Sequence, residues 1–498
     1  MWQDIPDTWL LEIFQYLKFQ DLVNITAVCK KWQRVALDET LWRKLIRRTY
    51  NLKNTDLAPG KDSWYSEYKR FYYHTPAIES EVLTDHTDEV LDVAFSHNGK
   101  YVCTTSKDCT VKVWEIGFPT TLKYSADLKE MLEWSLTQYA VFNKTDDFLL
   151  VCGVNINGPY YNEFFMGHGA IFDMTQGFTI IRVMGMNPPH LFADWADTEV
   201  CLGGYATNHD HLTINSFKVP DKRTRMNQET VKPPDPQEIL DNTDGNRLCT
   251  FYADCNHTMN LMVANVPIKQ KPPTPKCDIN RNANSVIYNT DRNNSDTCIK
   301  YLIFVAGIHD CIILHKLKDV QTTKDFDEAN AVRPFSYDVI RRPGQYISGM
   351  KLSHDHRYLY FNFREAVKVE ENEEWEDYLH LKENLQVNVI DLQTKQIMPD
   401  IVYEGHKGFS EYPAWYICLD TSDDIVASGS EEAKAYLWDR YYRCLITTLQ
   451  HKEGVVNGLE FNPKDCETMV TSGDDHTIRI WRSRNRMKTL QPVDSSYL

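Results

Sequence analysis

Histidine, aspartate and tryptophan recur in the same order at two places far apart in the chain. The two sets are His86, Asp108 and Trp114, and His451, Asp475 and Trp481. In both sets the aspartate precedes the tryptophan by six residues, and a strand-like segment rich in threonine and serine comes before it. A histidine, a hydroxyl and a carboxylate are the components of a hydrolytic triad. They are equally the components of a buried hydrogen-bond chain, to which an indole N–H can also donate.

Structural hydrogen bonding explains these sets better than catalysis does. A catalytic triad would have to occur twice, and it would leave the tryptophan without a part. A buried donor or acceptor costs about 1–3 kcal/mol if it lacks a partner, so a chain that joins all four groups ties neighbouring strands together. We therefore expect a structural role for these residues and no catalytic residue among them.

A third set has a glutamate in place of the aspartate. It consists of His406, Glu432 and Trp438. His406 precedes His451 by 45 residues and Trp438 precedes Trp481 by 43, which fits the period of one propeller blade. Because the glutamate side chain is one methylene longer, we expect the third network to be weaker or rearranged.

Short alternating strands surround these sets and continue through the chain between them. Segments 86–114 and 451–481 resemble WD repeats, and the recurring residues resemble the structural tetrad of WD-repeat β-propellers. Four more degenerate units are expected at 122–174, 178–218, 247–317 and 345–392. The total predicts a mainly β fold with seven blades, and six or eight blades remain open.

Closure of the predicted ring has two candidates, residues 80–84 and residues 486–491. One of them must supply the outer strand of the last blade, because open sheet edges pair promiscuously. Polar, proline-containing segments near 219–245 and 266–298 predict disordered insertions. The acidic segment 366–384 is expected to be a solvated loop, with contact to a basic substrate as the alternative.

Residues 4–45 precede the strands and carry apolar side chains at helical spacing. Four of them, from Leu10 to Leu17, lie on one face of a helix, and Asp21 is expected to cap the next helix. About 45 residues of short amphipathic helices cannot bury enough surface to be stable alone. We therefore expect a helical partner, or packing against the rest of the chain.

The order of residues in this stretch resembles an F-box. The resemblance rests on Trp32 and on the pairs Ile5-Pro6, Ile13-Phe14, Tyr16-Leu17, Asp21-Leu22, Val28-Cys29 and Leu41-Trp42. It implies docking onto the Skp adaptor of a cullin–RING ubiquitin ligase. The residues expected at the adaptor face, some of them serving the core instead, are Ile5, Pro6, Leu10, Ile13, Phe14, Leu17, Leu22, Val28, Cys29 and Trp32.

The sequence thus predicts three parts. These are an α-helical F-box at 1–48, a linker with a short aromatic helix at 49–79, and a WD-repeat β-propeller at 80–490. This order resembles the F-box/WD-repeat family over nearly the whole chain. The resemblance implies a non-catalytic substrate-recognition subunit of a Skp–cullin–F-box ubiquitin ligase. The cullin and RING subunits would be bound through the Skp adaptor. The propeller would bind a protein substrate. No metal or cofactor is expected.

Two alternatives to this function remain open. Segments 438–441 and 481–484 each depart by one residue from the Trp-Asp-x-Arg motif that the propeller adaptor of another cullin ligase recognises. That adaptor is therefore an alternative partner. The other alternative is a WD-repeat scaffold that acts independently of any ligase.

The amino-acid composition indicates which kinds of partner and which cellular compartment to expect. The net charge of −16 disfavours binding to nucleic acid. No apolar run approaches the ~18 residues of a membrane helix, and the F-box-like segment begins at once, so neither a membrane span nor a signal peptide is expected. The 13 cysteines contain no C-x-x-C pair, which favours reduced thiols in a cytoplasmic, or also nuclear, protein.

Overall fold

The computed structural model describes most of the chain. The described residues are 5–53, 56–156, 166–186, 191–207, 211–220, 246–252, 258–268, 298–307, 309–317, 337–367, 381–409 and 416–490. The predicted insertions near 219–245 and 266–298 lie almost entirely outside these ranges, as does most of the acidic segment 366–384. Pro267 and Cys298 nevertheless belong to strands, so the second predicted insertion is too long at both edges.

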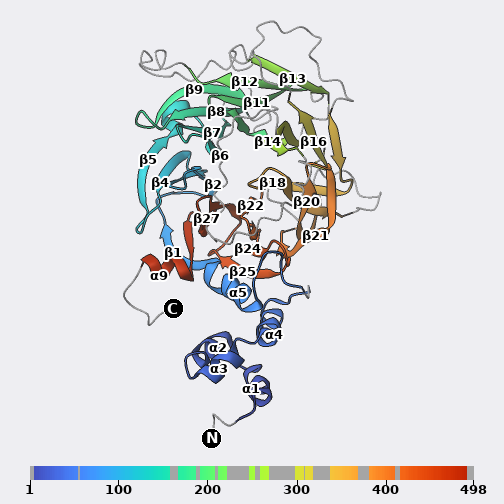
Figure 1. The fold of residues 1–498 in the computed structure, drawn as a ribbon. Coiled ribbons are helices and arrows are strands. Elements are labelled where there is room, and N and C mark those ends of the chain that lie inside the picture. Colours follow the sequence, from blue (N-terminus) through green and yellow to red (C-terminus); the bar gives the residue numbers. More distant parts are fainter. Residues whose placement is uncertain are drawn as a thin grey trace, which may run out of the picture. The chain divides into compact units, whose positions relative to one another are not determined.

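The strands form seven four-stranded sheets, which are the blades of a β-propeller (Figure 1). The mainly β fold and the blade number of seven are therefore confirmed. Contacts divide the chain into two compact units, one comprising residues 1–127, 383–386 and 401–498, and the other residues 128–382 and 387–400.

The first unit holds three sheets. Their strands are β2 (Val90–Phe95), β3 (Tyr101–Ser106), β4 (Thr110–Glu115) and β5 (Thr121–Asp127); β22 (Leu419–Thr421), β23 (Ile425–Ser428), β24 (Lys434–Asp439) and β25 (Leu445–Gln450); and β26 (Val456–Asn462), β27 (Asp465–Gly473) and β28 (Ile478–Ser483) with β1 (Pro76–Leu83). Side chains of neighbouring sheets share one buried cluster, which includes Trp114, Val470 and Ile480.

The second unit begins with the short helix α6 (Leu128–Leu132) and holds four sheets. Residues 383–386 of β20 and 401–407 of β21, in the last of these sheets, are assigned to the first unit. Their strands are β6 (Leu136–Phe142), β7 (Phe148–Asn155), β8 (Met166–Asp173) and β9 (Thr179–Met186); β10 (Ala193–Asp197), β11 (Val200–Thr207), β12 (His211–Lys218) and β13 (Asn246–Tyr252); β14 (Met259–Pro267), β15 (Cys298–Ala306), β16 (Cys311–Lys316) and β17 (Asp338–Arg341); and β18 (Gln345–Leu352), β19 (Tyr358–Ala366), β20 (Leu381–Asp391) and β21 (Gln396–Lys407). Phe251 and Phe304 meet edge to face between two of these sheets, with ring centroids 5.1 Å apart.

The predicted boundaries of the degenerate blades are wrong by one strand. β5 was expected in the unit 122–174, but it pairs with β4 and completes the preceding sheet. β13 likewise pairs with β12 rather than with β14. The outer strand of each blade follows its neighbour through a hairpin, so it is sequence-adjacent to the next blade although it is hydrogen-bonded to the previous one.

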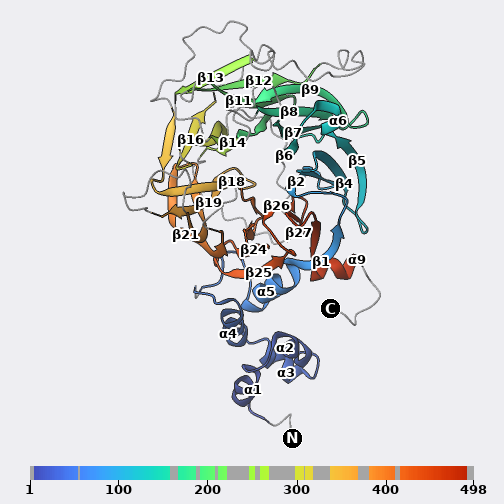
Figure 2. The same ribbon diagram turned by 180° about the vertical axis from the view of Figure 1, so that it is seen from behind.

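Strand β1 closes the last blade by pairing antiparallel with β28, which decides between the two candidates (Figures 1 and 2). β1 begins at Pro76, four residues before the predicted start of the propeller. The alternative segment near 486–491 forms the helix α9 (Arg484–Leu490) and packs beside β1. Two arginines of β28 reach β1: Arg479 pairs with Glu79, and Arg482 pairs with Glu81.

Short helices precede the propeller. They are α1 (Asp7–Phe14), α2 (Phe19–Ile25), α3 (Lys30–Ala36), α4 (Glu39–Tyr50), α5 (Trp64–Lys69) and the π-helix η1 (Arg70–His74). The Ser63 and Ser66 side chains cap α5 reciprocally, and the Asp38 carboxylate accepts from Thr40 at the start of α4. The prediction that Asp21 caps α2 is wrong, since the helix begins at Phe19 and Asp21 lies in its first turn. None of the described helices is long and apolar enough to cross a membrane.

The two ion pairs between β1 and β28 differ in burial, which gives a test of ring closure. Glu81→Ala removes the carboxylate that pairs with the buried Arg482 guanidinium. Because a buried charge is then left without its ion-pair partner, we expect the free energy of unfolding to fall by about 3–5 kcal/mol. Glu79→Ala is the matched control: Glu79 is more exposed and Arg479 keeps Asp475 at 3.0 Å, so a loss of about 1 kcal/mol or less is expected. Urea unfolding of both variants checks this, and equal losses would contradict it.

Candidate functional site

Two of the three histidine sets form complete hydrogen-bond chains. His86 contacts Asp108 through Nδ1 at 2.8 Å and the Thr104 hydroxyl through Nε2 at 2.8 Å. The Trp114 indole N–H donates to the same hydroxyl at 3.0 Å. This hydrogen-bond chain therefore links the segment before β2, strand β3, the turn after β3 and strand β4 of one blade.

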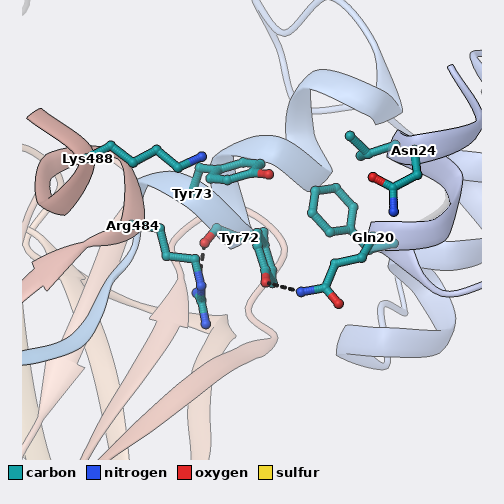
Figure 3. Close-up of a pocket in the computed structure, with 8 residues that line it drawn as sticks. Gln20, Asn24, Tyr72, Tyr73, Arg484 and Lys488 are labelled. Carbon is teal, nitrogen blue, oxygen red and sulfur yellow. Dashed lines mark hydrogen bonds between the residues drawn. The ribbon is translucent and has the colours of Figure 1, made fainter. Parts of the chain in front are cut away.

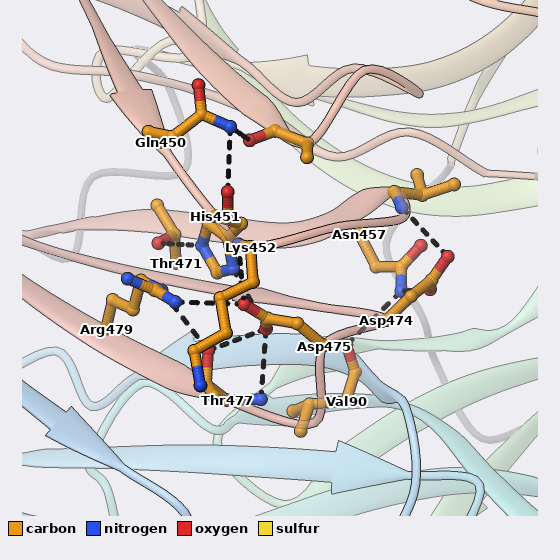
Figure 4. Close-up of polar contacts among 12 residues, drawn as sticks. Val90, Gln450, His451, Lys452, Asn457, Thr471, Asp474, Asp475, Thr477 and Arg479 are labelled. Atoms are coloured by element: carbon orange, nitrogen blue, oxygen red, sulfur yellow. Dashed lines mark hydrogen bonds and ion pairs between the residues drawn. The ribbon is translucent and has the colours of Figure 1, made fainter.

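The second complete chain lies in the blade that β1 closes (Figure 4). His451 contacts Asp475 at 3.1 Å and the Thr471 hydroxyl at 2.8 Å, and Trp481 donates to that hydroxyl at 2.8 Å. Arg479 adds an ion pair to Asp475. Asp475 thus stands at the centre of the polar contacts that hold this blade.

The charge state of these aspartates follows from their partners. Burial alone would raise the pKa of Asp475, but hydrogen bonds from His451, Thr477 and the Lys452 backbone hold that pKa well below its usual range. The pKa of Asp108 is lowered in the same way by His86 and Thr110. Both carboxylates are therefore ionised and fully engaged in hydrogen bonding.

The hydroxyls that complete the chains are unsuited to nucleophilic chemistry. The side chains of Thr104 and Thr471 belong to fully buried residues, and each hydroxyl already contacts a histidine and an indole. A substrate has no route to them. The geometry of these groups is that of a structural network.

The third set forms no hydrogen-bond chain, although the His406 and Trp438 rings meet edge to face with centroids 5.0 Å apart. His406 is completely buried, and neither of its ring nitrogens has a hydrogen-bond partner among the described residues. Trp438 donates to the backbone carbonyl of Glu404 at 3.0 Å, and Glu432 accepts from the Tyr436 hydroxyl. Burial lowers the pKa of His406 to about 3, so this histidine is neutral in the folded protein.

The N-terminal helices divide the ten residues predicted at the adaptor face by exposure. Buried are Leu10, Phe14 and Leu22; partly exposed are Ile5, Leu17, Cys29 and Trp32; exposed are Pro6, Ile13 and Val28. The Phe14 and Trp32 rings meet edge to face, with centroids 5.6 Å apart. The buried residues therefore form the core of this domain and can only support a docking face.

Two aromatic side chains outside the predicted adaptor face are also exposed on the helical domain. Trp9 is 68% exposed and Tyr16 is 75% exposed, and both follow the spacing of Ile13 along α1 and the turn after it. The prediction left them out. Their signal was present in the sequence, because apolar residues on both sides of one short helix cannot all be buried in so small a domain.

The helical domain is joined to the propeller through an aromatic cluster. Tyr68 of α5 stacks on Phe19 with ring centroids 4.7 Å apart. Tyr442, in the turn between β24 and β25, contacts the rings of Trp64 and Phe71. Its hydroxyl accepts a hydrogen bond from the backbone N–H of Ala58 at 2.9 Å.

A buried charge network reinforces the same junction. The Arg70 guanidinium contacts Glu67 at 2.9 Å and Asp439 at 2.6 Å, and both carboxylates are 1% exposed. Burial alone would lower the pKa of Arg70, but the hydrogen bonds and charges of Glu67, Asp439 and Asp424 raise it above its ordinary value. Sequence reasoning missed this network, because nothing in the sequence pairs residue 70 with residue 439.

Comparisons with known families agree with this architecture. A family model described as F-box-like matches residues 2–48, and the model described as WD domain, G-beta repeat, matches residues 79–115 and 443–482. The helical domain with its propeller therefore resembles the architecture of F-box/WD-repeat proteins.

Individual relatives resemble nearly the full chain. F-box/WD repeat-containing protein 5 of Mus musculus is 28% identical over 98% of this chain and 95% of its own length. The protein of the same name from Homo sapiens gives the same identity and coverage. The WD repeat-containing protein 26 homolog of Arabidopsis thaliana is 22% identical over 90% of this chain and 57% of its own length.

The lack of hydrogen bonds to His406 predicts a specific pH dependence. The unfolded chain protonates this residue near pH 6.5, whereas the folded chain does so near pH 3. Stability from neutral His406 is therefore fully present above pH 6.5 and is lost as the pH falls toward 3, by about 1.4 kcal/mol per pH unit. His406→Leu is expected to flatten the free energy of unfolding across this window.

His451→Leu is the matched control, because it removes a histidine that has hydrogen bonds to Asp475 and Thr471. It is expected to destabilise the protein at neutral pH by about 2 kcal/mol or more. Denaturant unfolding at a series of pH values measures both effects. A pH slope for His406→Leu parallel to that of the unaltered chain would contradict the prediction.

The charge network at the junction predicts that Arg70 contributes more to stability than Lys61 does. Arg70→Ala leaves the buried carboxylates of Glu67 and Asp439 without a cation, so we expect a loss of about 3–5 kcal/mol and faster proteolysis near residues 50–75. Lys61 pairs with the half-exposed Asp424 at 3.2 Å, so Lys61→Ala is expected to cost about 1 kcal/mol or less. Equal protease sensitivity of the two variants would show that the Arg70 network does not hold the junction.

Proposed function

We propose that this protein is the substrate-recognition subunit of a Skp–cullin–F-box ubiquitin ligase. The N-terminal domain would bind the Skp adaptor, and the cullin and RING subunits would be bound through it. The propeller would bind a protein substrate for ubiquitination and degradation. The matches to the F-box-like and WD-domain family models support the general role of substrate receptor.

The single observation that carries the proposal is the exposed apolar face of the helical domain. Trp9, Ile13, Tyr16 and Val28 are 45–75% exposed, although the same domain buries its own core well. Exposed apolar side chains gathered on one small domain mark a protein interface. We therefore assign adaptor binding to these side chains and to Pro6, with Leu10, Phe14 and Leu22 supporting them from below.

The junction supplies the mechanical part of the proposed function. A receptor with no chemistry of its own acts by raising the effective concentration of substrate near the ubiquitin-charged enzyme. That effect is largest when the connection between the two binding sites is stiff. Tyr442 and the Arg70 network fix the helical domain to a propeller blade, which limits the distances that the substrate can sample.

The protein is proposed to be non-catalytic and to act in the cytoplasm, and also in the nucleus. The buried state of the Thr104 and Thr471 hydroxyls supports the first point. Imaging of the tagged chain tests the second.

The propeller adaptor of another cullin ligase is the alternative partner. Two observations weigh against it at the near-match 438–441. Asp439 is 1% exposed, and its carboxylate is occupied by Arg70 and by the backbone N–H groups of Tyr441 and Tyr442. In the near-match 481–484, Arg482 is buried against Glu81. The charged groups of Asp439 and Arg482 are therefore already engaged within the chain.

Capture of purified Skp adaptor and cullin by the tagged chain tests the proposal. The double variant Ile13→Asp, Val28→Asp replaces two exposed apolar residues and is expected to weaken adaptor binding about tenfold or more while leaving the fold intact. Leu122→Asp, an equally exposed apolar residue on β5, is the matched control and should bind normally. Far-ultraviolet circular dichroism confirms that each variant is folded.

The other outcomes discriminate between the alternatives. Normal capture by the double variant would overturn the assigned face. If the unaltered chain captures neither protein, the ligase-independent scaffold is favoured. If a chain that lacks residues 1–45 still captures a cullin, the second adaptor becomes the leading partner.

A further inference from the structure

Two neighbouring cavities lie beside α2 and η1, the first bordered also by α9 and the second by α4 and α5. Their volumes are about 360 Å³ and 320 Å³, and they share Phe19, Gln20 and Tyr72 as a common wall. We call the two together the basic groove. Four cations line it: Lys18, Arg48, Arg484 and Lys488.

Within the part of the chain that the structure describes, no carboxylate neutralises the charge in the basic groove. None of the described residues that line either cavity is an aspartate or a glutamate. Among the described residues, none of the four cations is ion-paired with a carboxylate. Arg48 donates only to backbone carbonyls of Gln15 and Leu17, and Arg484 donates only to the backbone carbonyl of Tyr72.

The four groove cations differ in this respect from two arginines of β28 and from another arginine of α9. Arg479 and Arg482 pair with acidic residues, and so does Arg486, which contacts Asp465 at 3.0 Å from the same helix α9. The whole chain carries a net charge of −16, so carboxylates are abundant. A groove that excludes them on an acidic protein is suited to an anionic ligand.

Aromatic rings hold two of these cations in place (Figure 3). The Arg484 guanidinium lies over the Tyr72 ring at 4.2 Å, and the Lys488 ammonium lies over the Tyr73 ring at 4.7 Å. Gln20 of α2 donates to the Tyr72 hydroxyl at 3.3 Å from the opposite side. The cations are thus ordered before any ligand arrives, which lowers the entropic cost of binding.

We propose that the basic groove binds an extended acidic segment of a partner protein. One small anion would not reach both cavities, whereas an extended chain, which advances about 3.3 Å per residue, can place several carboxylates along them. The partly exposed ring of Tyr72 would contact the aliphatic parts of the segment. A phosphorylated segment offers the same anionic chemistry.

Binding in this groove would also act on the junction. Gln20 and Lys18 come from the helical domain, whereas Arg484 and Lys488 come from the helix that follows the last blade. A segment that contacts both sides bridges them, so its binding stabilises their relative placement. The inference does not depend on the Skp adaptor.

Fluorescence anisotropy of the full chain with fluorescein-labelled poly-glutamate tests the proposal. We expect saturable binding that weakens as salt is raised, and Lys488→Glu is expected to raise the Kd about tenfold. Arg486→Glu is the matched control, since it reverses a charge on the same helix outside the groove and should leave the Kd nearly unchanged. Labelled poly-glutamine should not bind.

A second variant guards against misfolding, and a second probe separates the sources of charge. Lys18→Glu lies on the other side of the groove and is expected to weaken binding in the same way. A phosphoserine peptide that binds more tightly than poly-glutamate would assign the groove to phosphorylated segments, and equal or weaker binding would assign it to carboxylates. Equal weakening by Arg486→Glu, or unchanged binding by Lys488→Glu and Lys18→Glu, would overturn the proposal.

Discussion

The pairing of β1 with β28 is the constraint on which the rest of this structure depends. It completes the last blade, and its polar contacts include the buried Arg482 and Glu81. β1 follows η1 almost immediately in the chain, so the same pairing that closes the propeller also anchors the helices before it. The Arg70 network and the Tyr442 cluster then fix the orientation of α5 on the neighbouring blade.

Sequence reasoning succeeded where a physical requirement is local. The spacing of His86, Asp108 and Trp114 reflects groups that must meet within one blade, and the same holds for the set that begins at His451. The helical domain was recognisable because its apolar periodicity and its residue order coincide. The number of blades followed from counting such units.

Sequence reasoning failed where partners are distant or ambiguous along the chain. The contact between Arg70 and Asp439 joins segments that share no pattern, and the outer strands of the degenerate blades are equidistant from two sheets in sequence. His406 was expected in a weaker or rearranged network but has no hydrogen-bond partner among the described residues. Glu432 turns instead to Tyr436, because the hydroxyl of that tyrosine is in its reach.

Closure by an N-terminal strand also governs the order in which the molecule can be completed. The Ser80 side chain donates to the carbonyl of Ile480 across a sequence separation of 400 residues. During synthesis, β1 leaves the ribosome long before the strand that will pair with it, so its edge stays open while the other blades form. Such non-local pairing is slow and leaves strand edges exposed to aggregation. The newly made chain is therefore expected to need chaperone protection until its last blade emerges.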